Sequence, residues 1–443
     1  MTDAASHTSL VAQSDRVRRR NAAEKRFRAY GLTAICIGLA MLVFLIYTIV
    51  GSGWNGFFQT RITVQVELVQ EEIDAAETGF LKTAAYRTII TKNLKRELAA
   101  RGLAEGIPDD EIEGLISRRA PATLRDFALA NPDRIGETVE FDFLAQSFID
   151  GYFKNRVNRD IAERSRNVSV VQLDLIDQMR DAGLAAKSFN WDFITGNDAS
   201  ESSPEAAGYG PAILGSLAMM IVVAVLAISV GVAASIFLEE FAPKNRITDL
   251  IEVNISNLAA VPSIVFGILG LAVFINYLGP LSGTDWLKNN SAFVGGLVLS
   301  LMTLPTIIIS TRASLKAVPQ SIRDAALGVG ASKMQTVFHH VLPLAAPGIL
   351  TGSIIGLAQA LGESAPLLLV GLVLAQGAAA PESIGDFFGG PNTAMPAQIY
   401  QWSTRADPAF YERAWGGIII LLIFLVTMNT LAVLLRRRFE RRW

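Results

Sequence analysis

Six stretches of the chain are almost purely apolar, and each is long enough to cross a lipid bilayer. At a rise of about 1.5 Å per residue, a helix of roughly 20 residues spans the hydrocarbon core. Because lipid offers no hydrogen-bond partner to an exposed backbone, we expect every stretch to be helical. The pattern predicts an all-α polytopic membrane protein with six transmembrane helices, at about residues 29–50, 212–237, 253–277, 292–311, 347–374 and 414–435.

The composition agrees with this reading. Of 443 residues, 51% are hydrophobic and 18% are charged, below the quarter that is usual in soluble domains. Cys36 is the single cysteine, so the chain forms no disulfide with itself. The three histidines, His7, His339 and His340, do not form a pattern typical of metal ligands, and we expect no metal site.

Basic residues at both ends predict the orientation. Residues 1–28 and 436–443 are rich in arginine, and short cytoplasmic segments retain Lys and Arg. Both tails are therefore predicted to be cytoplasmic, and the arginines of residues 436–442 are expected to contact anionic lipid. The first apolar stretch, residues 29–50, is too long for a signal peptide and lacks a small-residue cleavage site after it, so we expect an uncleaved transmembrane helix.

Residues 51–205 are polar enough to form a separate domain outside the membrane. The segment holds 26 acidic and 18 basic residues, a net charge of -8. Apolar residues recur at helical spacing after Pro108 and again from Val170, which predicts a helical extracytoplasmic domain. Residues 197–204 are rich in Asn, Asp and Ser and read as a flexible linker. We find no pattern of catalytic residues in this domain.

The cytoplasmic segment between the fourth and fifth stretches, residues 321–347, carries a distinctive motif. Small side chains allow close helix packing, a glycine permits a sharp turn, and a Leu-Pro pair marks the return to the membrane. These features predict a short, exposed pair of helices suited to docking. The residues concerned are Asp324, Ala325, Ala326, Gly330, Leu342 and Pro343.

This motif resembles the EAA loop of ABC-importer permeases, with Asp324 in place of the usual glutamate. The resemblance implies that the loop docks on a separate ATPase subunit and transmits its movement to the membrane helices. The chain has no Gly-x-x-x-x-Gly-Lys-Ser/Thr phosphate loop of its own. We therefore expect a transporter subunit that is not an enzyme and holds no cofactor, with ATP used by the partner.

Further segments narrow the resemblance to the PstA-type permeases of phosphate importers, over a permease domain of residues 206–435. They are residues 237–243, 260–267, 315–319 and 362–368. The resemblance implies a bacterial inner-membrane location and four kinds of neighbour: a second, related permease subunit, two ATPase subunits, an extracytoplasmic phosphate-binding protein and membrane lipid. It implies no contact with nucleic acid. The domain of residues 51–205 looks like the extra N-terminal region of some members.

Four residues are candidates for the translocation path. Glu363 is a carboxylate at membrane depth, which is costly unless it faces a cavity or a partner. Gln359 lies four residues earlier, on the same helix face. Pro262 and Ser263 interrupt the third stretch where a helix would bend around a pathway. An interhelical tie for Glu363 and a packing kink at Pro262 are the alternatives.

Other functions remain open at this point. A permease for another oxyanion, such as sulfate or molybdate, shares the same motifs. A membrane receptor would use the domain of residues 51–205 as a sensor, but the cytoplasmic tails are too short to hold an output domain. A catalytic membrane enzyme would need an acid-base or nucleophile pattern, which the sequence does not contain.

Overall fold

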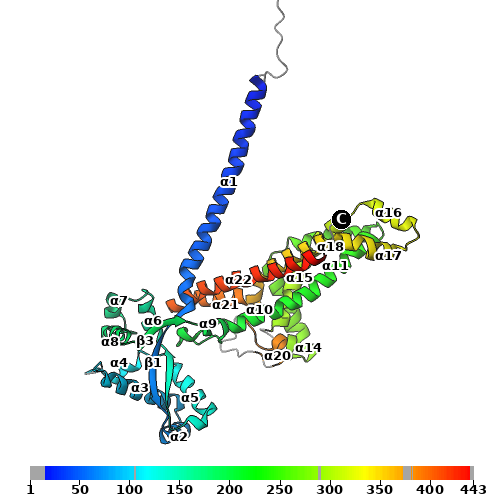
Figure 1. Cartoon of the computed structure of the whole chain (residues 1–443). Coiled ribbons are helices and arrows are strands. Elements are labelled where there is room, and N and C mark those ends of the chain that lie inside the picture. Colours follow the sequence, from blue (N-terminus) through cyan, green and yellow to red (C-terminus); the bar gives the residue numbers. More distant parts are fainter. Residues whose placement is uncertain (1–14, 104–105, 288–290, 373–380, 382, 440–443) are drawn as a thin grey trace, which may run out of the picture. The chain divides into compact units, whose positions relative to one another are not determined.

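A computed structural model describes residues 15–103, 106–287, 291–372, 381 and 383–439. Within these residues, six helical segments are long and apolar enough to cross a membrane, so the predicted number is confirmed (Figure 1). Their bounds are Arg16–Phe57, Gly210–Phe241, Ser263–Ser282, Ala292–Lys316, Lys333–Gly362 and Pro408–Leu434.

The first of these segments is built on α1, Asp15–Gly53, which runs without a break for 39 residues. At about 1.5 Å per residue it is close to 60 Å long, well beyond the bilayer core. Its first turns carry the arginines of the N-terminal tail, and its apolar side chains from Tyr30 to Tyr47 are exposed, as expected where lipid replaces water. The chain continues through a short helical turn at Trp54–Phe57.

The domain that follows, which we call the inserted domain (residues 58–195), contains a sheet that the sequence analysis did not predict. Its three strands are β1 (Phe58–Glu67), β2 (Thr138–Leu144) and β3 (Ala185–Phe189), in the order β2-β1-β3 and all antiparallel. In β1 the residues alternate between buried and half-buried positions from Arg61 onward. The inserted domain is therefore mixed α and β rather than purely helical.

Most helices of the inserted domain bury their apolar stripes in one core that they share with this sheet. The stripe that the sequence predicts after Pro108 is buried through Ile112 and Leu115, and the one from Val170 is buried through Leu173 and Ile176. A single core forms as a result. The helices are α2 (Gln70–Thr78), α3 (Lys82–Ala100), α4 (Asp109–Glu113), α5 (Ala120–Ala130), α6 (Ser147–Phe153), α7 (Arg159–Arg164), α8 (Val170–Asp181) and α9 (Asp192–Thr195).

The joining segment, residues 196–209, is ordered, and the prediction of a flexible linker is wrong. Asp198, Ala199 and Glu205 are all less than 5% exposed. The Asp198 side chain accepts a hydrogen bond from Trp402 and forms an ion pair with Arg405. These two residues lie 204 and 207 positions later in the chain. A run of Asn, Asp and Ser signals irregular backbone correctly, but the sequence does not reveal distant partners that immobilise it.

The second and third spans are separated by an amphipathic helix, and its second half, residues 253–259, falls within the predicted third span. The second span combines α10 (Gly210–Val223) and α11 (Ser229–Ile236) through wider helical turns. Next comes α12 (Arg246–Ala259), which has no buried residue and carries Asp249 and Glu252. The third span begins only at Ser263, with α13 (Ser263–Leu269), and ends with α14 (Gly279–Ser282). The predicted start at residue 253 is about ten residues early.

The permease core is organised around α15 (Ala292–Lys316), the most buried of the spans. It packs along α18 (Leu342–Gly362) through glycines that stand one turn apart. A Cβ atom at Gly352 would lie 2.0 Å from the Ser310 Oγ, and one at Gly348 would lie 2.4 Å from the Ser314 Oγ. Small residues at this spacing let two membrane helices approach closely. Pro305 lies inside α15, and the helix continues through it.

The helices that complete the permease are α16 (Gln320–Gly328), α17 (Lys333–Thr336), α19 (Ala365–Leu369), α20 (Ile384–Gly389), α21 (Met395–Thr404) and α22 (Pro408–Phe439). The fifth span, predicted at residues 347–374, instead begins at Lys333 and ends at Gly362. The backbone at Glu363 is extended, which stops the helix twelve residues before the predicted end.

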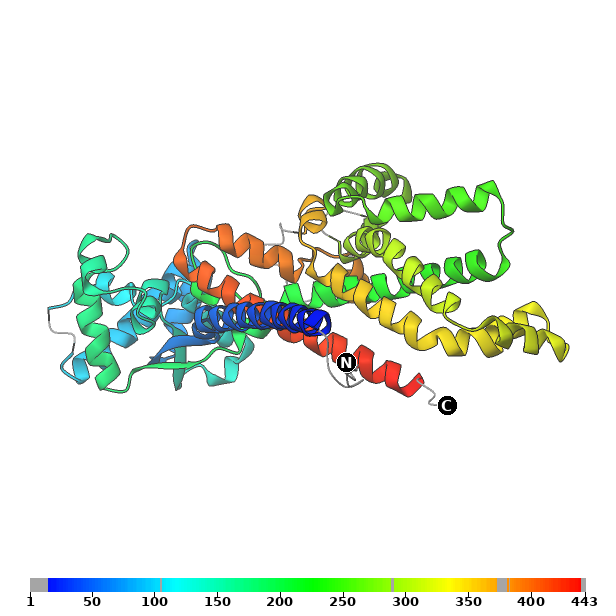
Figure 2. The ribbon, with the colours of Figure 1, turned by 90° about the horizontal axis from the view of Figure 1, so that it is seen from above.

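The last helix, α22, contacts the inserted domain near its start and α18 near its end (Figure 2, orange to red). Glu412, near its start, forms ion pairs with the inserted domain. Arg436, near its end, donates a hydrogen bond of 3.0 Å to the Thr351 Oγ1 of α18. The 24 positions from Glu412 to Arg436 span about 36 Å of helix, enough to cross a bilayer core of about 30 Å. The inserted domain and the contact with Thr351 of α18 are thus separated by the length of one span.

Candidate functional site

The motif of residues 321–347 forms the exposed helix pair that the sequence predicts. Asp324 lies on α16, where its carboxylate accepts a hydrogen bond of 3.1 Å from the Gln320 Nε2. Ala325 is exposed, whereas Ala326 is buried against the permease. Gly330 adopts a φ of +90°, a conformation that favours glycine, and so turns the chain from α16 into α17. Leu342 and Pro343 begin α18.

The outer surface of this loop is apolar. Leu327, Val329 and Met334 are 48%, 86% and 62% exposed, and Val329 stands at the tip beside Gly330. Ser332 and Gln335 cap the second helix reciprocally, which fixes the loop after the turn. A rigid loop that presents apolar side chains is the form expected of a docking surface. We call residues 320–336 the coupling loop.

The coupling loop is held to the second span by an arginine that the sequence analysis did not single out. The Arg323 Nη2 lies 2.6 Å from the Glu240 Oε1, and both side chains are largely buried, at 13% and 8% exposure. Arg323 also donates to the backbone carbonyls of Leu315 and Val318, at 2.9 and 2.7 Å. One guanidinium therefore joins α16, the end of α15 and the end of the second span.

The neighbouring Glu239 makes a second set of contacts at the same level. Its carboxylate lies 3.3 Å from the Arg312 Nε and 3.6 Å from the Lys316 Nζ. Arg312 also pairs with Glu252 of the amphipathic helix α12, at 2.6 Å. Glu239 and Glu240, at the end of the second span, are thus held in ion pairs rather than free in solvent. The arginines that pair with these acids lie 73 and 83 residues later in the chain, so no local pattern in the sequence indicates the contacts.

Glu363 lies at a helix break, where the helical backbone is interrupted just after the fifth span, rather than inside a span. It is the first residue after α18, with an extended backbone, and its side chain is half-buried. Gln359 is exposed on the last turn of the same helix. Irregular backbone at membrane depth is tolerated where it lines a cavity or is covered by protein. The break is thus compatible with a role in a path, although no contact joins Gln359 to Glu363.

Pro262 and Ser263 lie at a second break, where α13 begins. Pro262 is exposed and precedes the helix, and Ser263 is half-buried in its first turn. The helix α13 packs against α19, the helix that follows the Glu363 break. A Cβ atom at Gly267 would lie 2.7 Å from the Pro366 Cα. The two helices that follow these breaks, α13 after Pro262 and α19 after Glu363, are therefore in contact.

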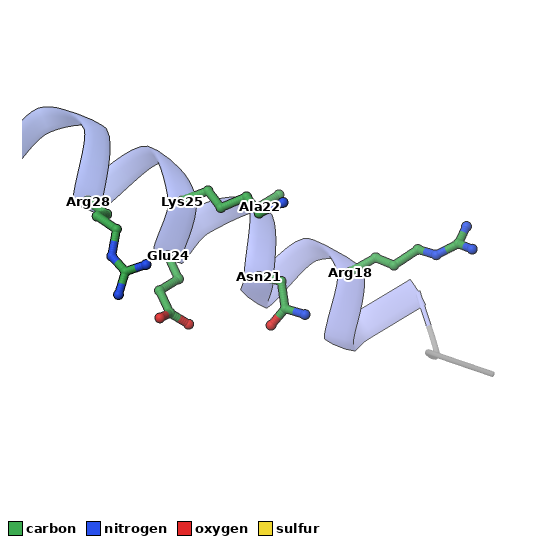
Figure 3. Close-up of a pocket in the computed structure, with 6 residues that line it drawn as sticks. All are labelled: Arg18, Asn21, Ala22, Glu24, Lys25 and Arg28. Carbon is green, nitrogen blue, oxygen red and sulfur yellow. The ribbon is translucent and has the colours of Figure 1, made fainter. Parts of the chain in front are cut away.

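A hollow on α1 is lined by Arg18, Asn21, Ala22, Glu24, Lys25 and Arg28 (Figure 3). All six side chains come from one helix, and Figure 3 shows them fanned along it rather than converging on a point. The surface is basic, because Arg18, Lys25 and Arg28 stand there with a single acid, Glu24. In the part of the chain that the structure describes, no group of His, Cys, Asp and Glu side chains is arranged to hold a metal ion.

Two family models match the chain, one on each half. The model described as "Binding-protein-dependent transport system inner membrane component" covers residues 227–443, which contain the coupling loop and both breaks. The model described as "Domain of unknown function (DUF3333)" covers residues 14–163, which contain α1 and most of the inserted domain. The boundary between them lies near the joining segment. The match places the chain among multi-pass components of the inner membrane.

Curated relatives agree with the model of the transport system component. The chain is 32% identical over 239 residues to "Phosphate transport system permease protein PstA 1" of Mycobacterium tuberculosis, covering 54% of this chain and 72% of that protein. It is equally similar to PstA of Mycobacterium leprae, over 54% and 73%. A solved structure of the MetNI methionine ABC transporter aligns at 17% identity and a TM-score of 0.41, covering 52% and 95%. The chain belongs to the family of PstA phosphate transport system permease proteins.

Proposed function

We propose that this chain is the membrane permease subunit of an ATP-driven phosphate importer. The observation that carries the proposal is the 32% identity over 239 residues to a relative named as a phosphate transport permease, together with a family model that covers the whole coupling loop. The rigid, apolar tip at Val329 and Gly330 supports it, since a transporter subunit without an ATPase site needs a surface on which its motor can dock.

The proposed assembly contains a second related permease subunit, two ATPase subunits and an extracytoplasmic phosphate-binding protein. ATP is used by the partner subunits, and this chain holds no cofactor. Movement of an ATPase reaches the membrane through α16, because Arg323 ties that helix to Glu240 at the end of the second span. The arrangement supports a mechanism in which packed spans rock together around a path.

Both termini lie in the cytoplasm in this proposal. The arginines of α1 precede the first span, and those that follow residue 435 end the last one. The coupling loop then faces the cytoplasm, where ATP is available, and the inserted domain faces the outside. The span-length separation along α22 between Glu412 and Arg436 agrees with this arrangement.

The path itself is proposed to pass the breaks at Pro262–Ser263 and at Glu363, with Gln359 beside it. A carboxylate can accept the proton that hydrogen phosphate carries, whereas sulfate has no proton to donate at neutral pH. Glu363 would therefore favour phosphate over a fully ionised oxyanion. The cationic contact that an anion needs is expected from the partner permease.

The experiment that tests the substrate is uptake competition in proteoliposomes that contain the complete complex. Labelled phosphate is supplied with its binding protein, and unlabelled phosphate, sulfate or molybdate is added in excess. We expect unlabelled phosphate alone to abolish the uptake of label. Uptake that phosphate leaves unchanged and sulfate or molybdate suppresses would assign the chain to another oxyanion.

A further inference from the structure

The inserted domain contacts the start of α22 through charged side chains that are almost completely buried. The Lys154 Nζ lies 2.7 Å from the Asp150 Oδ2 and 2.8 Å from the Glu412 Oε1. The Arg156 Nε lies 2.6 Å from the Glu412 Oε2. Two acids and two bases balance in this group, and Lys154, Asp150 and Glu412 are each at most 9% exposed. We call these four residues the junction cluster.

The residue after Glu412 makes a second buried connection. The Arg413 guanidinium donates hydrogen bonds of 2.6 Å to the carbonyls of Glu205 and Ala207, both in the joining segment. It also donates a bond of 3.0 Å to the Gln59 Oε1 of β1, and it stands over the Phe193 ring. One side chain of the last span thus binds the sheet of the inserted domain, α9 and the joining segment.

Close backbone contacts surround the same turn of α22. A Cβ atom at Gly53 would lie 2.7 Å from the carbonyl oxygen of Trp415, and one at Gly56 would lie 3.3 Å from that of Glu412. A Cβ atom at Gly416 would lie 2.9 Å from the Phe193 ring. The start of α22 is therefore enclosed by chain that enters the inserted domain on one side and leaves it on the other.

We propose that the junction cluster and Arg413 make the inserted domain and the start of α22 one rigid body, so that the domain moves with the last span and positions it during transport. Separation of the domain from α22 would break the ion pairs of Glu412 and the three hydrogen bonds of Arg413 at once. It would also open the close backbone contacts at Gly53, Gly56 and Gly416. We therefore expect the interface to stay closed throughout the transport cycle. The residues of the cluster act as positioning residues, not as contacts for the substrate.

A disulfide across the interface tests whether it opens. The Ser147 Oγ and the Asp407 Oδ1 lie 3.4 Å apart, and neither residue belongs to the junction cluster. Ser147→Cys and Asp407→Cys are introduced together with Cys36→Ser, which removes the native thiol. The complete complex is oxidised in the nucleotide-free state and in an ATP-trapped state, and the disulfide is quantified in each. Uptake is then measured before and after reduction.

We expect the disulfide to form equally in both states and to leave uptake unchanged. A disulfide that forms in one state only, or one that stops uptake until it is reduced, would overturn the proposal. The uptake readout rests on the proposed function, but the disulfide yield does not. Loss of phosphate uptake in the parent complex would therefore count against the function alone, because the two yields would still compare the states.

A second measurement covers the case in which the paired cysteines prevent assembly. Spin labels are placed by Thr88→Cys in α3 and Tyr411→Cys in α22, at two exposed positions. The distance between the labels is measured in the nucleotide-free and ATP-trapped complexes. We expect the same distance in both states, and a change between them would contradict a rigid body.

Discussion

Lys154 of the inserted domain and Glu412 of the last span form an ion pair of 2.8 Å, although 258 positions separate them in the chain and both side chains are buried. The pair lies where an apparently separate domain meets a membrane helix. Because neither charge is solvated, each depends on the other. The inserted domain is for this reason a structural part of the permease and not a tethered appendage.

The first prediction concerns this pair. After Glu412→Gln, Asp150 is the remaining acid of the junction cluster, beside the two bases Lys154 and Arg156. Removal of one partner of a buried pair typically costs about 3–5 kcal/mol. The midpoint of denaturant unfolding of the purified chain in detergent measures the loss. Glu137→Gln is the control, because the Arg134–Glu137 pair is about half exposed and a surface pair contributes roughly 0–1 kcal/mol. Equal effects of the two substitutions would contradict a buried cluster.

The second prediction concerns pH. Burial raises the pKa of the Glu205 carboxyl above its ordinary value of 4.5, although Ser117 donates a hydrogen bond to it. The contribution of the neutral carboxyl to stability is complete below the unfolded pKa and is lost as the pH rises through the raised pKa of the folded state. Glu205→Gln removes this loss. The variant should therefore be more stable than the wild type near neutral pH and equal to it near pH 4.5.

Thermal unfolding between about pH 4.5 and pH 8 measures this difference. The gap between the variant and the wild type should widen as the pH rises. A gap that stays constant across the range would show that the effect of the substitution is steric and that Glu205 does not titrate in this window.

The third prediction concerns the tie between the coupling loop and the second span. Arg323→Lys keeps the charge but cannot reach Glu240, Leu315 and Val318 together, because an ammonium lacks the planar fork of a guanidinium. The loss of one charge-assisted hydrogen bond, about 1.5–3 kcal/mol, should uncouple ATP hydrolysis from transport by roughly tenfold or more. The number of ATP molecules hydrolysed per phosphate taken up measures this effect.

Lys316→Gln is the control for Arg323. Lys316 is 58% exposed, and its Nζ lies 3.6 Å from Glu239, so its removal should change the coupling ratio little. A similar loss of coupling in both variants would mean that positive charge at this surface matters and that the position of α16 does not.

The fourth prediction concerns the path. Glu363→Gln keeps the size of the side chain at the break after α18 but removes the charged acceptor for the proton of phosphate. A hydrogen bond to a charged group contributes about 1.5–3 kcal/mol, so phosphate uptake should fall by roughly tenfold or more while the complex still assembles. Glu201→Gln, at an exposed position of the joining segment, should not affect uptake. Unchanged uptake in the Glu363 variant would remove this residue from the path.

Much of the permease follows from its sequence. The six spans are evident because membrane helices must be both long and apolar, and lipid permits little else. The coupling loop is evident because Ala326, Gly330 and Pro343 each have a local structural role. Span ends are harder to predict. At Glu363 an apolar sequence continues beyond the helix, so hydropathy does not mark the point at which the backbone becomes extended.

In the inserted domain, one strand could have been predicted from the sequence, whereas the contact with α22 could not. In β1, Ile62, Val64 and Val66 are buried and alternate with polar residues, a period of two that predicts a strand. That pattern was sufficient to find the sheet. The contact between the inserted domain and α22 could not be predicted. Gln59 and Arg413 form a hydrogen bond across 354 positions, and no local pattern in the sequence indicates such a contact.

We propose that the coupling loop docks a separate ATPase, and co-purification shows whether it does. Gly330→Val forces a branched side chain into a φ of +90°, which costs about 1–3 kcal/mol and distorts the tip of the loop. Gly328→Ala is the control, because its Cβ would meet open space. The wild type and Gly328→Ala should retain the ATPase subunit in mild detergent, and Gly330→Val should lose it. Retention by all three, or absence of an ATPase from the wild-type preparation, would contradict the account.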